Sequence, residues 1–294
     1  MNKADKYMFE AIGEILSDGY KDVNPRPHYA DGTPAHTYSI NHVFRTYDLS
    51  QGEFPICTLR PIAWKTAIKE IFTIYQNPTN KIAEMCERGV TWWNEWNIGD
   101  GTIGQRYGAT VSRYDLINNL IKDIQNDPYG RRKVVSLWQE TDLRETAGLA
   151  PCAFLTIWNV RNANGKEYLD MMMVQRSGDM LMASGPGGVN EVQYAALLMM
   201  IARHTKLEPG VFTHVVANEQ IYDRHIEAAE EMLRRYDEKL REESDETLVL
   251  NHMDTRPILL LNDNKTDFYD MTIEDFFMVS YNPVKPQLKL EIGI

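Results

Sequence analysis

The chain has 294 residues, 43% hydrophobic and 25% charged, and its 31 basic against 42 acidic side chains give a net charge of −11 at pH 7. This composition is typical of a globular enzyme, and such acidity argues against a protein that coats long nucleic acid with a basic face. The longest apolar run, 194–202, is far shorter than the ~20 residues of a membrane span. The first residues show no signal-peptide pattern, and three cysteines without metal-ligand spacing favour reduced thiols in the cytoplasm.

Hydrophobic periodicity predicts helices and strands that alternate irregularly along the chain. In the first predicted helix, for example, Met8, Ile12 and Ile15 share one face. The predicted helices cover residues 5–16, 62–75, 115–125, 191–205 and 223–236, and the predicted strands cover 38–49, 133–138, 153–160, 168–175, 248–251 and 257–261. Since no repeat or long linker divides them, the sequence predicts a single domain of α+β (mixed α/β) class over residues 1–294.

Cys152 precedes an apolar strand and is the first candidate for chemistry. A thiol acts as a nucleophile only when it is a thiolate, which requires a nearby cation or polar donors. From this segment alone, the more common role of such a cysteine is that of a buried small hydrophobe.

Two polar segments could bind an anion. Residues 175–179 (QRSGD) bring an amide, a guanidinium, a hydroxyl and a carboxylate together, either as an anion site or as a turn with a local ion pair. Residues 129–133 (YGRRK) place three adjacent cations before a strand, which suits a phosphate or an edge strand protected by charge. Arg26 lies in a loop between two prolines, where a surface arginine is the ordinary expectation.

Three other patterns do not indicate a site. Residues 99–104 fit G-x-G-x-x-G, but they follow a tryptophan-rich segment and precede no clear helix, so we do not expect a dinucleotide fingerprint. The seven histidines show no pair at zinc spacing, so no metal site is expected. Residues 185–188 (GPGG) are predicted to form a flexible loop.

Taken together and in chain order, these segments resemble the thymidylate synthase family. The resemblance runs from about Arg26 to the C-terminus, and seven motifs in the family's order make it specific. These seven are residues 92–96 (WWNEW), 103–108 (IGQRYG), 131–132, 151–152, 175–179, 190–195 (NEVQYA) and 221–222, and the ending, 281–283 and 286–289, matches as well. The resemblance implies a large mixed sheet that forms a dimer interface, with helices on its other face.

The resemblance also implies a substrate, deoxyuridylate (dUMP), and residues that bind it. Cys152 would attack carbon 6 of uracil, and Asn190 would read the base, where an aspartate would have favoured cytosine. Arg131 and Arg132 would reach the phosphate from the partner subunit of an obligate homodimer, with Arg176 also favouring the Cys152 thiolate. The implied substrate-binding residues are Arg26, Arg131, Arg132, Gln175, Arg176, Ser177, Gly178, Asp179, Asn190, Gln220 and Tyr222.

The implied co-substrate is 5,10-methylenetetrahydrofolate, which would supply a one-carbon unit and a hydride and leave as dihydrofolate. Asp179 would bond the pterin ring, and Trp93, Trp96 and Ile294 would complete the folate site and exclude water. Glu70 would organise proton transfers. The implied catalytic residues are Cys152, Glu70, Tyr107, Arg176 and Asn190.

The sequence departs from the family at three places and leaves two rival functions open. Gln220 stands where the family usually has histidine, Ala63 falls at about the position of a cofactor-contacting histidine of many members, and the loop between Asp179 and Asn190 is about three residues longer than usual. One rival is a deoxypyrimidine hydroxymethylase on the same scaffold. The other is a non-catalytic homologue that binds a nucleotide or its own messenger RNA.

Overall fold

We describe a computed structural model, which covers residues 1–244 and 256–294. The predicted strand 248–251 lies outside the described residues. The helices are α1 (Lys3–Asp18), α2 (Trp64–Ile71), α3 (Ile82–Glu87), α4 (Gly108–Arg113), α5 (Leu116–Asn126), α6 (Glu140–Glu145), α7 (Val189–His204) and α8 (Ile226–Ser244). The strands are β1 (Tyr20–Lys21), β2 (Thr37–Asp48), β3 (Lys133–Ser136), β4 (Ala153–Ala163), β5 (Lys166–Gln175), β6 (Gly178–Asp179), β7 (Glu208–Tyr222), β8 (Ile258–Leu261) and β9 (Phe276–Val279).

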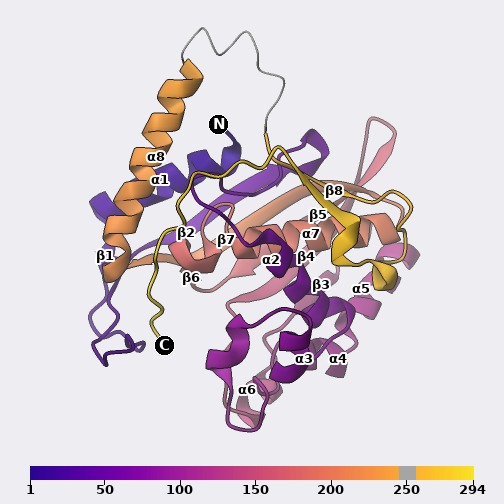
Figure 1. The fold of residues 1–294 in the computed structure, drawn as a ribbon. Coiled ribbons are helices and arrows are strands. Elements are labelled where there is room, and N and C mark those ends of the chain that lie inside the picture. The colour runs from indigo at the N-terminus through magenta and orange to yellow at the C-terminus, as the bar shows by residue number, and fades with distance from the viewer. Residues whose placement is uncertain (245–255) are drawn as a thin grey trace.

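A large mixed sheet forms the framework, with strand order β1-β2-β7-β5-β4-β3 and β6 beside β7. The ladders β1–β2, β2–β7, β5–β4 and β4–β3 are antiparallel, whereas β5 and β6 each run parallel to β7. The strands β8 and β9 form a separate hairpin-like pair. The mixed sheet with packed helices confirms the predicted fold class (Figure 1).

Helix α7 is the centre of the core. It packs on β5 and β7, and α2 packs against α7, so that α7 is enclosed (Figure 1). Val192, Ala195, Leu198 and Ile201 are almost fully buried, and the helix is apolar on most sides, as expected for an enclosed helix. Polar residues at its first turn, including Asn190 and Glu191, therefore stand at the end of a rigid and buried element.

Two ladder registers bring distant polar residues together. In the β4–β5 ladder Ala153 is opposite Gln175, so the residues just outside it, Cys152 and Arg176, are neighbours. The backbone N–H of Arg176 donates to the Cys152 carbonyl at 3.0 Å. In the β2–β7 ladder Arg45 is opposite His214. The sheet thus holds Arg45 and His214 on two of its strands, and Cys152 and Arg176 at the ends of two others.

Most predicted elements are present with shifted ends. The predicted helix 62–75 is α2 followed by a π-helical turn, Phe72–Gln76, and the predicted helix 223–236 begins as a 3-10 turn and extends to Ser244. The long strand β7 was not predicted, because its sequence begins with Glu208-Pro209-Gly210 and carries buried polar residues that break the alternation. The short helices α3, α4 and α6 and the strand β9 were also missed.

Candidate active site

Cys152 lies directly before β4, beside the guanidinium of Arg176. The Arg176 Nη2 atom is 3.5 Å from Cys152 Sγ and donates to the Ala150 carbonyl at 2.8 Å, while Nε donates to the Pro151 carbonyl at 3.0 Å. These carbonyls fix the planar fork of the guanidinium, so one edge of it stays against the thiol. Among the described residues no ion pair joins Arg176 to Asp179, so the structure does not support the interpretation of this segment as a turn with a local ion pair.

The charge state of Cys152 reflects two opposing effects. Burial raises the pKa of the Cys152 thiol, whereas the guanidiniums of Arg176 and Arg26 act to lower it. Burial is the larger effect in the single chain, so the pKa of the thiol is raised overall, while Arg176 favours the thiolate as expected, by the smaller effect. The thiol is half-buried next to a cation, and added positive charge or hydrogen-bond donors would shift it towards the nucleophilic form.

Glu70 on α2 is a buried carboxyl close to the same site. Trp93 Nε1 donates to Glu70 Oε1 at 2.6 Å, and Gln193 Nε2 donates to Oε2. Burial raises the pKa of Glu70 to about 7, and these two hydrogen bonds partly oppose the rise. A carboxyl that titrates near neutrality is suited to taking and giving protons at working pH.

Tyr107 lies between Trp93, which contacts Glu70, and the backbone of Cys152. Its ring lies 4.8 Å from that of Trp93, and its hydroxyl accepts a hydrogen bond from the Cys152 backbone N–H at 3.4 Å. Tyr107 has a φ of 48°, in the left-handed region that a bulky residue rarely adopts. Such strain persists only where the surroundings hold it, and it is common at functional sites.

Asn190 lies in the first turn of α7, in contact with residues from two other elements and with the next turn of its own helix. Its Oδ1 accepts from Ser184 Oγ at 2.8 Å, and Gln175 Nε2 lies 3.4 Å away. Its Nδ2 donates to Gln193 Oε1 at 2.9 Å. The sequence reasoning missed Gln193 and Ser184, although Gln193 follows Asn190 by one helical turn, a spacing that places two side chains on one face.

Arg26, the predicted phosphate-binding residue, and Tyr222, the predicted sugar-binding residue, lie in space near the C-terminal residues. Two backbone hydrogen bonds of 2.8 and 2.9 Å join His28 to Ile294, which brings the terminal residue beside the Arg26 loop. Tyr222 ends β7 and is buried. Burial raises its pKa to about 12, the charges of Asp179 and Cys152 add to the rise, and the charge of Arg26 opposes it, so these three groups lie near the Tyr222 hydroxyl.

Gly178, Asp179 and Gln220 lie where β6 pairs with β7, with Asp179 opposite Gln220. Burial raises the pKa of Asp179 to about 7, and its Oδ1 accepts from the Met182 N–H at 3.3 Å. A side chain at position 178 would press on Ser184 Cβ, 3.1 Å from its own Cβ, so this glycine permits close packing. The half-buried Ser177 lies between Arg176 and this pair.

Arg131 and Arg132 lie away from Cys152 of their own chain. Both are exposed just before the edge strand β3, and within the described ranges neither guanidinium makes a hydrogen bond or ion pair. The β3–β4 register places Arg132 level with Asn159, about 20 Å along β4 from Cys152. Lys133 does not join them at the surface, because it is buried with its Nζ donating to the Gly130 carbonyl.

The segment 185–188 is not a flexible loop. It follows the π-helical turn Met180–Ser184 and is buried. The Gly187 carbonyl accepts from the Cys57 N–H at 2.9 Å, and the Gly187 N–H donates to Glu191 Oε2 at 2.7 Å. The prediction failed because glycine and proline here serve close packing, with a φ of 63° at Gly187.

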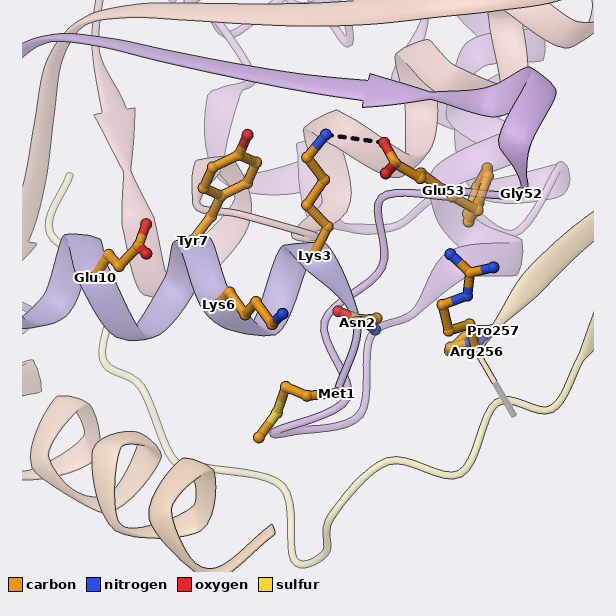
Figure 2. A pocket seen from close by; sticks show the side chains of 11 residues that line it. Met1, Asn2, Lys3, Lys6, Tyr7, Glu10, Gly52, Glu53, Arg256 and Pro257 are labelled. Carbon is orange, nitrogen blue, oxygen red and sulfur yellow. Dashed lines mark hydrogen bonds and ion pairs between the residues drawn. The ribbon is translucent and has the colours of Figure 1, made fainter. Parts of the chain in front are cut away.

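Other features lie outside this constellation. Trp96 is half-buried in the 3-10 turn Trp92–Trp96. A surface cavity of about 420 Å³ is lined by α1, residues 52–54 and residues 256–257, far from Cys152, and the Lys3–Glu53 ion pair crosses it (Figure 2). In the described part of the chain, no group of His, Cys, Asp or Glu could hold a metal ion, and no helix is long and apolar enough to cross a membrane.

A thiol against a guanidinium, backed by a buried carboxyl that titrates near neutrality, defines a site for nucleophilic and acid–base chemistry. The thymidylate synthase family model matches residues 6–294. Thymidylate synthases of Streptococcus suis and Lactococcus lactis are each 45% identical to the chain, over the full length of both proteins. The solved structure of the thermostable thymidylate synthase A from Bacillus subtilis is 30% identical, covers 99% of each chain and superimposes with a TM-score of 0.83. The chain belongs to the thymidylate synthase family.

Proposed function

We propose that this protein methylates dUMP to dTMP, with 5,10-methylenetetrahydrofolate as co-substrate and dihydrofolate as the second product. The main support is the placement of Cys152 Sγ 3.5 Å from Arg176 Nη2, with Glu70 and Asn190 in the same constellation. The family membership and the full-length match to proteins named thymidylate synthase support the same function.

Cys152 is the proposed nucleophile. The phosphate dianion of dUMP would be held by Arg26, Arg176 and Ser177, and its binding fixes the pyrimidine beside the thiol. Addition of the thiolate to carbon 6 makes carbon 5 a nucleophile. Elimination of the thiolate at the end of the reaction restores the ring, so Cys152 is regenerated.

The co-substrate supplies both the one-carbon unit and the hydride that completes the methyl group. The Asp179 carboxyl fits a pterin, because it accepts one backbone hydrogen bond and has further capacity for a ring N–H. Trp93, Trp96 and Ile294 would bound this part of the site and exclude water. Glu70 would hold and release protons during the change at carbons 5 and 6 of the base.

Asn190 is the proposed reader of the base, with its amide donating to oxygen 4 and accepting from the ring N–H. Tyr222 would bond the sugar hydroxyl, and Gln220, the substitute for the usual histidine, would assist through its amide. Gln175 and Gly178 would line the nucleotide-binding site. Tyr107 would act near the thiol, since its hydroxyl is bonded to the Cys152 backbone.

We also propose an obligate homodimer with shared sites, built from one domain over residues 1–294. Arg131 and Arg132 are exposed and too distant for their own Cys152, so they would complete the phosphate site of the partner subunit. The exposed Phe44 and Val134 on the sheet supply apolar surface for such an interface. The three free cysteines fit a reducing compartment, so we propose a cytoplasmic location.

The function is tested by incubating the protein with dUMP and methylenetetrahydrofolate and following dihydrofolate by absorbance and the nucleotide by mass. We expect dTMP and dihydrofolate in equal amounts. Hydroxymethylated nucleotide without dihydrofolate would identify the hydroxymethylase instead. No product and no covalent adduct with 5-fluorodeoxyuridylate plus folate would identify a non-catalytic homologue.

The nucleophile and the shared site have separate tests. Cys152→Ser should abolish the fluorodeoxyuridylate adduct, with Cys86→Ser as the matched control that keeps it. Mixing inactive Arg131→Ala and Cys152→Ser proteins under conditions of subunit exchange should restore activity, because one site of the hybrid dimer is intact. Persistent inactivity of well-exchanged hybrids would contradict the donation of Arg131 across the interface.

A further inference from the structure

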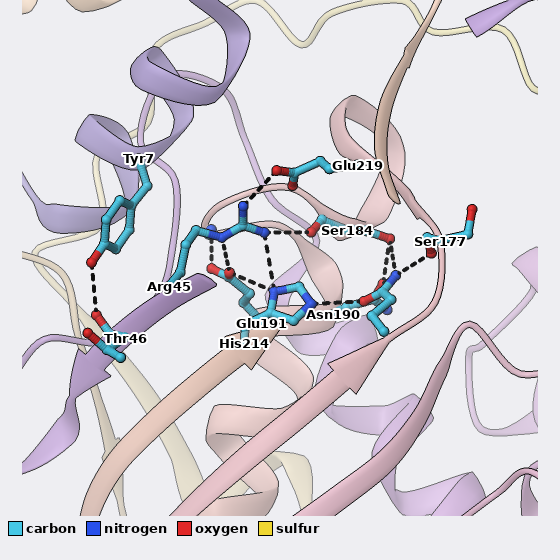
Figure 3. Close-up of polar contacts among 11 residues, drawn as sticks. Tyr7, Arg45, Thr46, Ser177, Ser184, Asn190, Glu191, His214 and Glu219 are labelled. Carbon is cyan, nitrogen blue, oxygen red and sulfur yellow. Dashed lines mark hydrogen bonds and ion pairs between the residues drawn. The ribbon is translucent and has the colours of Figure 1, made fainter. Parts of the chain in front are cut away.

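A continuous row of polar side chains, all buried except the half-buried Asn190, runs from the sheet to Glu70. It starts at Arg45 on β2 and His214 on β7, and Figure 3 shows these residues beside Glu191, Ser184 and Asn190. The row continues through Gln175 between His214 and Ser184, and through Gln193 between Asn190 and Glu70. Each hydroxyl or amide group in the row can be a donor or an acceptor. Once one group is fixed as a donor to its neighbour, the donor-to-acceptor order of the next hydrogen bonds along the row is fixed as well, and this order is called the direction of the row.

The direction is set at Gln175. Its Nε2 lies 3.0 Å from the Ser177 carbonyl and 2.7 Å from Ser184 Oγ, and these two acceptors take both of its hydrogens. In the reverse orientation the Gln175 oxygen would face the Ser177 carbonyl, which is backbone and offers only lone pairs. The carbonyl thus rejects the flipped amide.

His214 supports the same orientation from the other side. Its Nε2 lies 3.0 Å from Gln175 Oε1 and so carries a hydrogen, whether the ring is neutral or cationic. Its Nδ1 lies 2.9 Å from Glu191 Oε1 and 3.3 Å from Arg45 Nη2. Nδ1 can therefore donate to Glu191 when it is protonated or accept from Arg45 when it is not. The ring is fully buried and cannot turn away to water.

A cluster of charges holds His214 in place. Arg45 Nε donates to Glu191 at 2.9 Å, and Arg45 Nη1 donates to Glu219 at 2.8 Å, with all three side chains buried. The Gly187 N–H also donates to Glu191. Because each partner is paired, the cluster is a rigid support, and removal of one member would leave a buried charge without its partner.

The direction then passes to the base-reading residue. Ser184 Oγ accepts from Gln175, so its own hydrogen goes to Asn190 Oδ1 at 2.8 Å. Asn190 Nδ2 consequently faces Gln193 Oε1 at 2.9 Å, and Gln193 Nε2 faces Glu70. One Nδ2 hydrogen of Asn190 stays available to a ligand, and a flip of this amide would exchange donor and acceptor.

We propose that His214, Gln175 and Ser184 are specificity-determining residues, which hold the Asn190 amide in one orientation and thereby make the site accept a uracil nucleotide and reject a cytosine nucleotide. The inference rests on the proposed function, in which Asn190 reads the base. Uracil presents an acceptor at position 4 and a donor at the ring nitrogen, and cytosine presents the reverse pair. An amide free to flip would suit both bases, and an amide fixed by this row suits one.

The test compares dUMP and dCMP as ligands of wild type, Ser184→Ala and His214→Phe. Dissociation constants are measured by calorimetry, and turnover of each nucleotide is measured with methylenetetrahydrofolate. We expect the preference for dUMP over dCMP to fall about tenfold or more in both variants, because each loses a donor that orients the row. Ser184→Thr, which keeps the hydroxyl, should retain the preference.

The ratio separates specificity from general damage, because a structural defect weakens both nucleotides alike. Ser136→Ala removes a hydroxyl outside the row and is the matched control, with an unchanged ratio expected. Wild type that does not bind or convert dUMP would overturn the proposed function itself. If wild type prefers dUMP and the Ser184→Ala and His214→Phe variants keep the same preference for dUMP over dCMP as wild type, this inference alone is overturned.

Discussion

The pKa of Glu70 predicts a specific pH dependence of stability. Burial raises this pKa from 4.5 to about 7, so the folded chain keeps a proton that the unfolded chain has already lost over this interval. The stabilisation is complete below pH 4.5 and is lost as the pH rises through 7. Each tenfold change in proton affinity is worth about 1.4 kcal/mol, so Glu70 lowers the free energy of unfolding by about 3 kcal/mol between these limits.

Glu70→Gln removes this titration and keeps a similar shape. Its free energy of unfolding should therefore gain about 3 kcal/mol relative to wild type between pH 4.5 and pH 8, whatever the fixed effect of the substitution itself. The raised pKa of Asp179 contributes equally to both proteins and cancels in the difference. The measurement is urea unfolding followed by tryptophan fluorescence, at one protein concentration because a dimer's stability depends on concentration. Parallel pH profiles for the two proteins would refute the assignment of a near-neutral pKa to Glu70.

Three further predictions concern packing, the thiol and assembly. Gly187→Ala should destabilise the fold by about 2 kcal/mol or more, because its Cβ would collide with the Cys57 backbone, whereas Gly165→Ala, at a similar φ of 75° but in open space, should cost less in the same urea experiment. Arg176→Lys should move the alkylation of Cys152 by iodoacetamide to higher pH, since the fork that holds the cation at the thiol is lost, and an unmoved profile would contradict that role. Phe44→Arg should shift the protein towards monomer in sedimentation and reduce activity, and an unaltered dimer would exclude β2 from the interface.

The sequence predicted the elements whose apolar residues are regularly spaced, and it missed those in which polar side chains are buried. Helices α1, α5 and α7 have clear patterns, because one face or nearly the whole helix is apolar. Strand β7 carries His214 and Glu219 in the core, which no periodicity marks as buried. These two are buried because Arg45 on β2 pairs with the cluster, and that partner is 169 residues away from His214.

The residues of the candidate site could be predicted from the sequence, but the contacts between them could not. Cys152 and Arg176 were chosen separately, and the register of β4 and β5 shows why they meet. Glu70 was expected to handle protons, yet its contacts with Trp93 and Gln193 depend on how α2 lies against α7. The net charge state of Cys152 could not be deduced from nearby cations, because burial opposes them and is a property of the folded chain.

The pairing of β2 with β7 also governs how the chain reaches its fold. Residues 37–48 form the first long strand, and their main partner is residues 208–222. During synthesis on the ribosome, β2 has only the two-residue β1 beside it until most of the chain has emerged. Contacts so distant in sequence slow folding, and an unpaired strand edge is prone to aggregation. Nascent chains that stop before residue 208 should therefore remain incompletely folded and require chaperones, so production of this protein is sensitive to anything that delays the second half of translation.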